Sequence, residues 1–265
     1  MCANIMGMDD NWLKQTDEPL FPDLLWSKPE RKDQAGKLLI IGGHAHGFNR
    51  AAAAYVGAEE AGIGEVKVVL PDKLKSVVGA SLSGAVYAPS TASGTLAAEA
   101  LDALNRYAER ADAVLLVQPG DNSQTALTLA RFIKASQRPV ILVDDVVEQI
   151  KHDFIELLKP GHSLLVLSLN GLQSVMKLVG AERTVQHDMG LRPLILSLTQ
   201  EPKLAGFKII TVVEDSIVAV AGGRAVSTTR TSRPELSALA AFAAAWWIWQ
   251  PAQPLEALAT AVFEF

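Results

Sequence analysis

Short runs of apolar residues alternate with alanine-rich segments along most of this chain. The runs are apolar at consecutive positions, which predicts strands whose two faces are both covered. The expected strands are Lys37–Gly42, Glu65–Leu70, Gly84–Ala88, Ala113–Val117, Val140–Val143 and Ser163–Ser168. The expected helices between them are Arg50–Ala61, Thr95–Ala108, Ser123–Lys134, Val146–Leu158 and Leu172–Val179. This alternation predicts an α/β protein with a mostly parallel sheet and helices on both faces.

The pattern changes after Gly190, where apolar runs follow one another without helical segments between them. The expected strands here are Leu194–Leu198, Lys208–Val213 and Ser216–Ala221, with a turn in the sequence Glu-Asp-Ser. This spacing predicts an antiparallel addition to one edge of the sheet. Two helices, Pro234–Trp249 and Pro254–Glu264, are expected to end the chain.

The chain divides at the start of the strand pattern. Residues 1–30 are polar, contain three prolines and are interpreted as an N-terminal extension. Residues 31–265 are interpreted as a single α/β domain, because a chain of 265 residues can bury one large core.

The composition of the chain limits the kinds of molecule that the protein is expected to bind. The net charge of −5 and a pI near 5.6 argue against nucleic acid, because no cluster of Lys and Arg offers a surface for phosphates. The single cysteine, Cys2, excludes a disulfide within the chain and fits a reducing compartment. The first residues lack the pattern of a secretory leader, and the longest apolar stretch, Leu236–Trp249, is too short to span a bilayer. We therefore expect a cytoplasmic protein with small-molecule or protein partners and no membrane contact.

The loop after the first expected strand is rich in glycine and histidine. It has the place of an anion-binding loop, between a strand and a helix. However, His44 replaces a glycine of the dinucleotide fingerprint, and Phe48 and Asn49 replace the Lys and Ser or Thr of a P-loop. His44 and His46 are either ligands of a metal ion or loop residues that cap and pack, and no acidic residue or cysteine lies near them in sequence.

Motifs in this loop and further along the chain follow the order of a known family. Gly42, Gly43 and His44 are followed by Asn49, Arg50 and the segment AGIGEV. Later segments in the same order are ADAVLLVQPGDN, RPVILVDDVV, LLVLSLNGLQSVMKLVG and TSRPELSALAAFAAAWW. In order and spacing the chain resembles the ADP/ATP-dependent NAD(P)HX dehydratases. The resemblance implies a three-layer ribokinase-like fold and assembly into a homo-oligomer.

The resemblance also implies a set of site residues. Glu235 stands near the position of the family's acid–base aspartate, and Asp145 matches the last aspartate of a family strand that ends in Asp-Ala-Asp. Because Asp144 and Asp145 follow a buried strand at its carboxyl end, either could coordinate magnesium through water, and Asp145 is the candidate metal residue. The implied substrate- and nucleotide-binding residues are Gly42, Gly43, Asn49, Arg50, Pro119, Gly120, Asn170, Gln173, Ser232 and Arg233. ATP or ADP with magnesium is the implied cofactor. From the residues alone, an N-capping role for Asp144 and Asp145 is an equal alternative.

Most of these positions differ from the family pattern. Ser232, Arg233 and Pro234 replace the glycine-containing turn of the anion hole, and Pro234 has no N–H group to offer. Asn170 replaces a histidine, and Arg50 replaces a small alanine beside the pocket for the hydrated nicotinamide. We therefore expect a catalytically impaired relative that acts as a nucleotide or metabolite binder or an oligomeric scaffold. The alternative is an active dehydratase that uses Glu235. Small-molecule kinase activity would need the same anion hole.

Overall fold

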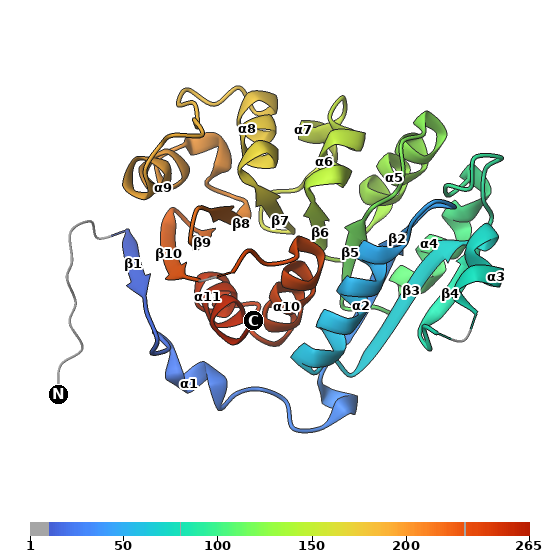
Figure 1. Ribbon diagram of the computed structural model, residues 1–265, viewed down its shortest axis with the longest axis horizontal. Helices are drawn as coiled ribbons and strands as arrows, with labels where there is room; N and C mark the ends of the chain where they lie inside the picture. Colours follow the sequence, from blue (N-terminus) through green and yellow to red (C-terminus); the bar gives the residue numbers. More distant parts are fainter. Residues whose placement is uncertain (1–10, 80, 231) are drawn as a thin grey trace.

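The computed structural model describes residues 11–79, 81–230 and 232–265. In this part of the chain a single sheet runs across the middle of the molecule in the order β1-β10-β9-β8-β7-β6-β5-β2-β3-β4 (Figure 1). The strands are β1 (Trp12–Gln15), β2 (Lys37–Gly42), β3 (Glu65–Pro71), β4 (Ala85–Ala88), β5 (Ala113–Val117), β6 (Val140–Val143), β7 (Ser163–Ser168), β8 (Lys208–Val213), β9 (Ser216–Ala221) and β10 (Arg224–Thr229). Strand β9 pairs antiparallel with β8 and with β10, and the other pairs are parallel.

Helices cover both faces of the sheet and give three layers (Figure 1). One core lies under α4 (Leu101–Ala108), α5 (Ser123–Ala135), α6 (Asp144–Ile150), α7 (Phe154–Leu157), α8 (Leu169–Leu178) and α9 (Leu191–Thr199). The core on the other face lies under α1 (Pro22–Leu25), α2 (Asn49–Ala61), α3 (Lys75–Val78), α10 (Leu236–Trp249) and α11 (Pro254–Glu264). The predicted α/β architecture, with antiparallel strands toward the C-terminal part of the chain, is confirmed.

The expected strand Leu194–Leu198 is wrong, because these residues belong to helix α9. Leu194, Ile195 and Leu198 are all buried, and their spacing of one, three and four residues is that of one helix face. A short apolar run is equally typical of a strand and of a helix, so its composition alone did not distinguish them.

Other boundaries also differ from the sequence prediction. The expected helix Thr95–Ala108 begins as a 3-10 turn at Ala98, and Val146–Leu158 is divided into α6 and α7. Strand β10 was not predicted, although it continues the antiparallel addition by pairing with β9.

The N-terminal extension contributes a strand to the sheet. Residues of β1 pair in parallel with β10, from Trp12 beside Ala225 to Gln15 beside Thr228. The side chain of Gln15 is fully buried and donates to Thr228 Oγ1 at 3.0 Å. The boundary predicted at residue 30 therefore does not separate the extension from the sheet. Cys2 and most of the segment examined for a leader lie outside the described residues.

Helix α10 is buried by its own chain. Trp246 and Trp247 are 0% and 5% exposed, and the indole N–H of Trp249 donates to the carbonyl of Ala35 at 2.9 Å. Trp246 and Trp247 belong to the core that α10 shares with α2 and the sheet, and Trp249 packs against it partly buried. No helix among the described residues combines the length and the hydropathy needed to cross a membrane.

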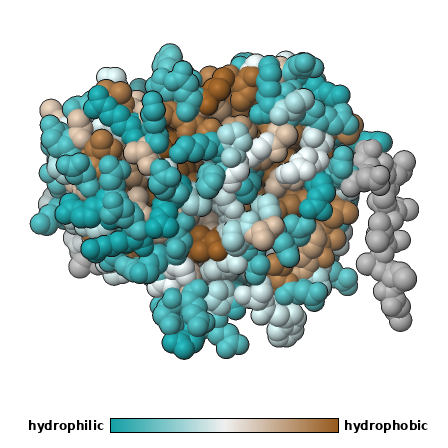
Figure 2. Space-filling view, turned by 180° about the vertical axis from the view of Figure 1, so that it is seen from behind, coloured by the Kyte–Doolittle hydropathy of each residue, from teal (hydrophilic) through white to brown (hydrophobic). Residues whose placement is uncertain are grey.

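The exposed large apolar side chains of the described residues are scattered over several parts of the surface. Figure 2 shows a largely hydrophilic face with hydrophobic side chains in several separate areas. The exposed large hydrophobic residues lie on different elements: Leu13, Trp26, Val56, Val77, Leu127 and Ile155. Assembly into a homo-oligomer therefore stays a prediction from the family resemblance.

Candidate functional site

The loops after β2, β5, β6 and β7 meet at the carboxyl edge of the parallel strands, where open α/β sheets place ligands. A cavity of about 690 Å³, the Arg50 cleft, is lined by His44, Asn49, Arg50, Gln118, Pro119, Gly120, Asp121, Asp145, Glu148, Gln149 and Lys151. A cavity of about 380 Å³, the Asn170 cleft, is lined by Ser168, Leu169, Asn170, His187, Val212, Val213, Glu214, Arg233, Pro234 and Leu236.

The residues predicted from the sequence divide between these clefts and their surroundings. Those in the Arg50 cleft are Asn49, Arg50, Pro119, Gly120 and Asp145. Those in the Asn170 cleft are Asn170 and Arg233. Those that line neither cleft are Gly42, Gly43, Gln173, Ser232 and Glu235. The structure therefore distributes the predicted residues over two cavities and their surroundings, and their role in binding stays a prediction.

The two glycines that end β2 have structural roles. A Cβ on Gly42 would lie 1.8 Å from the carbonyl oxygen of Val117, so only glycine allows β2 and β5 to approach this closely. Gly43 has a φ of +78°, which favours glycine and turns the chain away from the strand. These residues shape the loop without contributing to either cavity.

Gln118 occupies the N-terminal end of α2. This helix has no side-chain cap of its own, and Gln118 Oε1 accepts the N–H of Arg50 at 3.1 Å. Gln118 has a φ of +42°, a left-handed conformation that is uncommon for a residue with a side chain. In the family motif a glycine stands here. An amide oxygen thus takes a helix N–H group that a bound anion could otherwise use.

Arg50 and Asp145 form an ion pair inside the Arg50 cleft. Arg50 Nη1 lies 2.9 Å from Asp145 Oδ2, and the two side chains are 43% and 26% exposed. Burial raises the pKa of the Asp145 carboxyl above its ordinary value, against the lowering effect of the Arg50 guanidinium. The second oxygen, Oδ1, is buried and has no hydrogen-bond partner. The carboxylate is therefore only partly satisfied by its cation.

This arrangement does not fit magnesium at Asp145. Magnesium in such sites is bound by carboxylates, water and substrate phosphates, without a cation between them. Here the Arg50 guanidinium bonds to Asp145 Oδ2 and already supplies this carboxylate with a cation. Among the described residues, no group of three or more His, Cys, Asp or Glu side chains is arranged to bind a metal ion.

Asp144 and Asp145 have different roles, and neither is the N-cap of α6. The cap position is Val143, and Asp144 is the first helical residue. Asp144 Oδ1 accepts the N–H of Ser168 at 2.8 Å, which ties the start of α6 to the end of β7. Burial raises the pKa of Asp144 while the bonds to Ser168 lower it. Asp144 thus stabilises the edge that positions both clefts.

The two histidines of the glycine-rich loop pack against each other. Nδ1 of His44 accepts the backbone N–H of His46 at 3.3 Å, and their rings meet edge to face. Burial, with a smaller contribution from His46, lowers the pKa of His44, against an opposing effect of Asp145. The neutral imidazole of His44 thus forms one wall of the Arg50 cleft.

Asn170 and Gln173 lie on α8 but face different surroundings. Asn170 is exposed at the first turn, where Ser168 caps the helix by accepting the N–H of Gly171. Gln173 Nε2 donates to the carbonyl of Val185 at 3.0 Å and so holds the loop after the helix. Of this pair, only Asn170 lines a cavity.

Glu235 is the N-cap residue of α10. The helix begins at Leu236, so Pro234 lies before it rather than in its first turn. The carboxylate of Glu235 bends back and its Oε2 accepts the N–H of Ala238 at 2.7 Å. Ser232 and Arg233 are exposed before this cap. The carboxylate therefore satisfies one of the free N–H groups at the start of the helix.

Several lining residues were missed by the sequence prediction. Gln118, Asp121, Glu148, Gln149 and Lys151 were not among the predicted site residues. Gln149 crosses the cleft and donates to the carbonyl of Gly120. Glu148 and Gln149 follow the two aspartates at the start of α6 by four residues, and this helical spacing is the signal that could have identified them.

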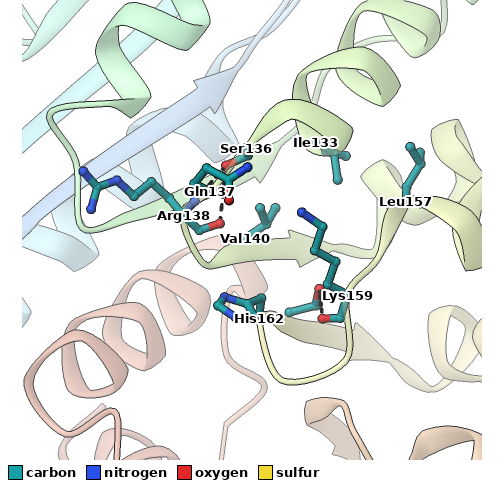
Figure 3. Close-up of a pocket in the computed structure, with 9 residues that line it drawn as sticks. Ile133, Ser136, Gln137, Arg138, Val140, Leu157, Lys159 and His162 are labelled. Carbon is teal, nitrogen blue, oxygen red and sulfur yellow. Dashed lines mark hydrogen bonds between the residues drawn. The ribbon is translucent and has the colours of Figure 1, made fainter.

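Another hollow lies at the opposite edge of the sheet, near the amino ends of β6 and β7 (Figure 3). Its volume is about 60 Å³, and Lys159 and His162 are among the residues around it. The hydrogen bonds drawn there close local turns, including the contact between Ser136 and Arg138. This hollow is far smaller than the two clefts and lies at the edge away from the converging loops.

The chain matches no protein-family model and no curated protein, whereas solved structures resemble it closely in fold. A ribokinase-like superfamily protein from Enterococcus faecalis has a TM-score of 0.73 at 15% identity, covering 97% of this chain and 86% of that one. The ADP/ATP-dependent NAD(P)H-hydrate dehydratase from Bacillus subtilis, co-crystallised with ATP and Mg²⁺, has a TM-score of 0.61 at 14% identity, covering 92% and 86%. An ADP complex of Bacillus subtilis pyridoxal kinase has a TM-score of 0.53 at 13% identity, covering 86% and 88%. The chain therefore has a ribokinase-like fold.

Proposed function

We propose that this chain is a dehydratase-like protein that has lost dehydration activity and retains its clefts to bind a nucleotide or another metabolite. The ribokinase-like fold and the ordered motif resemblance to the NAD(P)HX dehydratases support the relationship. The observation that carries the loss of activity is the contact of Glu235, whose carboxylate caps α10 through the N–H of Ala238.

A capping carboxylate is poorly suited to acid–base catalysis. Loss of water from a hydrated nicotinamide requires a proton for the leaving hydroxyl, and the proton donor must reach that oxygen. The carboxylate of Glu235 is instead held by the N–H of Ala238 at the start of α10. The capping geometry also directs the side chain back to its own helix.

The start of α10 also lacks the features of a strong phosphate site. Pro234 has no N–H, and the N–H of Ala238 is already bound by Glu235. The polar side chains that line the Asn170 cleft are those of Ser168, Asn170, His187, Glu214 and the exposed Arg233. We assign ATP or ADP to this cleft, held by Arg233 through its phosphates, as a bound ligand rather than as a reactant.

The second candidate function is an active ATP- or ADP-dependent NAD(P)H-hydrate dehydratase. One observation favours it: Glu235 stands between Pro234 and Leu236, which both line the Asn170 cleft. A rotation of the carboxylate away from Ala238 would bring it toward that cavity. In this case Glu235 would be the acid–base group, in place of the family's aspartate.

The two functions are separated by one assay. The purified protein is incubated with hydrated NADH and either ATP or ADP, and the recovery of NADH absorbance is followed. We expect no recovery above a protein-free control, together with a rise in melting temperature when ATP or ADP is present. Turnover that Glu235→Ala abolishes would establish the dehydratase instead, and the absence of any nucleotide effect on melting would contradict nucleotide binding.

A further inference from the structure

The ion pair in the Arg50 cleft leaves bonding capacity unused. The guanidinium of Arg50 has five N–H donors. Among the described residues its side chain makes one hydrogen bond, which Nη1 donates to Asp145 Oδ2. On the other side of the pair, Asp145 Oδ1 is buried without a well-aligned hydrogen bond, and the backbone N–H groups of Gln118 and Val146 lie close enough to the carboxylate to lower its pKa. Both side chains line the same cavity of about 690 Å³. A ligand in this cavity could therefore bond to either member of the pair.

The position of Arg50 is unfavourable for a purely structural cation. It is the second residue of α2, a helix of 13 residues, and the positive end of the helix dipole repels a cation there. Its backbone N–H is held by Gln118, which adopts a strained left-handed conformation to reach it. Such strain concentrates at binding sites, where it persists because ligand contacts depend on it.

The charges around the cavity restrict which ligand can open the pair. Its wall carries three carboxylates, on Asp121, Asp145 and Glu148, and two cations, on Arg50 and Lys151. Lys151 already lies 3.5 Å from Glu148. A simple anion that drew Arg50 away would leave the half-buried Asp145 without its cation, which is costly. A neutral ligand would gain nothing from either charge.

We propose that the Arg50 cleft binds a small zwitterion, whose carboxylate bonds to Arg50 and whose ammonium group bonds to Asp145, so that the ligand replaces the direct ion pair. Each protein charge then keeps an opposite charge beside it, because the ammonium group takes the place of Arg50 Nη1 at Asp145 Oδ2. This inference rests on the proposed function in one respect, namely that the fold is retained to bind a metabolite.

The test uses three probes of matched length: 4-aminobutyrate, butyrate and butylamine. Binding is measured by calorimetry and by the shift in melting temperature of the full chain. We expect 4-aminobutyrate to bind at least about tenfold more tightly than either singly charged probe, a difference of roughly 1.4 kcal/mol. Butyrate binding as tightly as 4-aminobutyrate would overturn the proposal in favour of a simple anion site, and no binding by any probe would also overturn it.

Substitutions of Arg50 and Asp145 test whether 4-aminobutyrate binds at the ion pair. Arg50→Gln and Asp145→Asn keep hydrogen-bonding side chains of similar size, so each is expected to fold and to weaken 4-aminobutyrate binding at least about tenfold. The matched control is Arg224→Gln, because Arg224 pairs with Glu256 at 2.8 Å with similar exposure on β10 and α11, away from the cleft. This control is expected to bind normally. Unchanged binding in both cleft variants would overturn the proposal.

Failure of this inference is distinguishable from failure of the proposed function. Turnover of hydrated NADH would contradict the loss of activity without affecting the probe measurements. Conversely, nucleotide binding in the Asn170 cleft with no probe binding would contradict only the zwitterion site.

Discussion

The carboxylate of Glu235 is held against the backbone of its own helix, whereas a catalytic carboxylate must reach its substrate. A carboxylate in the first turn of a helix near a cavity is compatible with catalysis or with capping, and the sequence left both interpretations open. The bond from Ala238 N–H to Glu235 Oε2 favours capping. Arg50 presents a similar case, because its long side chain neither fills the cleft nor stays free but pairs with Asp145.

The capping role predicts a defined order of stability among Glu235 variants. Glu235→Ala removes the acceptor for Ala238 N–H and is expected to lower the free energy of unfolding by about 1 kcal/mol. Glu235→Gln keeps an oxygen acceptor and is expected to lose less than half of that. Urea unfolding measures both. An alanine variant as stable as the parent protein would show that the cap contributes nothing.

Lys208 provides a prediction about pH. Lys208 is buried, and its ammonium group donates to the carbonyl of Gly161 at 2.6 Å and lies 4.3 Å from the ring centre of Trp247. Burial lowers the pKa of Lys208 from its ordinary value of 10.5. Between the lowered folded pKa and 10.5 the unfolded chain binds more protons, so this group makes the folded state more stable as pH rises.

The measurement compares the parent protein with Lys208→Met across the alkaline range. The difference in free energy of unfolding should shift in favour of the parent as pH rises toward 10.5 and should be constant near neutral pH. Subtracting the variant removes the contributions of other titrating groups. A difference that moves the other way with pH would mean that the charged form of Lys208 is stabilised by the fold.

At the scale of elements, helices α2 and α10 pack closely enough that a single methyl group matters. A Cβ on Gly57 would lie 2.9 Å from both Cα and the carbonyl oxygen of Ala238. This contact fixes the position of α10 relative to α2. Glu235 lies at the start of α10 and Arg50 at the start of α2, so the contact also fixes the relative positions of these two residues. The packing of two helices therefore determines the separation of the two clefts.

Gly57→Ala tests this packing. Alanine would normally stabilise a helix interior by about 1 kcal/mol relative to glycine. Here the contact is with backbone that cannot move aside, so overpacking of about 1–3 kcal/mol is expected to outweigh that gain. The control Glu60→Ala, at an exposed position of the same helix, should change stability by only a few tenths of a kcal/mol. A more stable Gly57→Ala protein would contradict close packing of α2 on α10.

The elements that were predicted best are those whose sequence pattern fits only one kind of secondary structure. Fully apolar runs such as Ala113–Val117 became central strands, because covered strands must be apolar on both faces. Leu194–Leu198 was assigned wrongly because a short apolar run fits two periods. Strand β1 was missed because half of its residues are polar and its pairing with β10 is distant in sequence.

For the whole molecule, the order of the motifs predicted which loops lie together in the fold but not the side-chain contacts between them. Asn49, Arg50, Pro119, Gly120 and Asp145 meet in one cleft because their strands are neighbours in the parallel sheet. The Arg50–Asp145 pair, which joins residues 95 positions apart, depends on side-chain conformations that no local pattern encodes. The separation of the two clefts could not be predicted from the sequence either, because it depends on how the helices pack.

We propose that the scaffold retains ligand binding without the dehydration reaction. The decisive measurement is the rate of NADH absorbance recovery from hydrated NADH with ATP or ADP, compared between the parent protein and Glu235→Gln. Glutamine retains an acceptor for the cap and removes the acid–base group, so folding is preserved while catalysis is not. We expect both proteins to match the protein-free rate, and a parent rate well above that of Glu235→Gln would show that the chain is an active dehydratase.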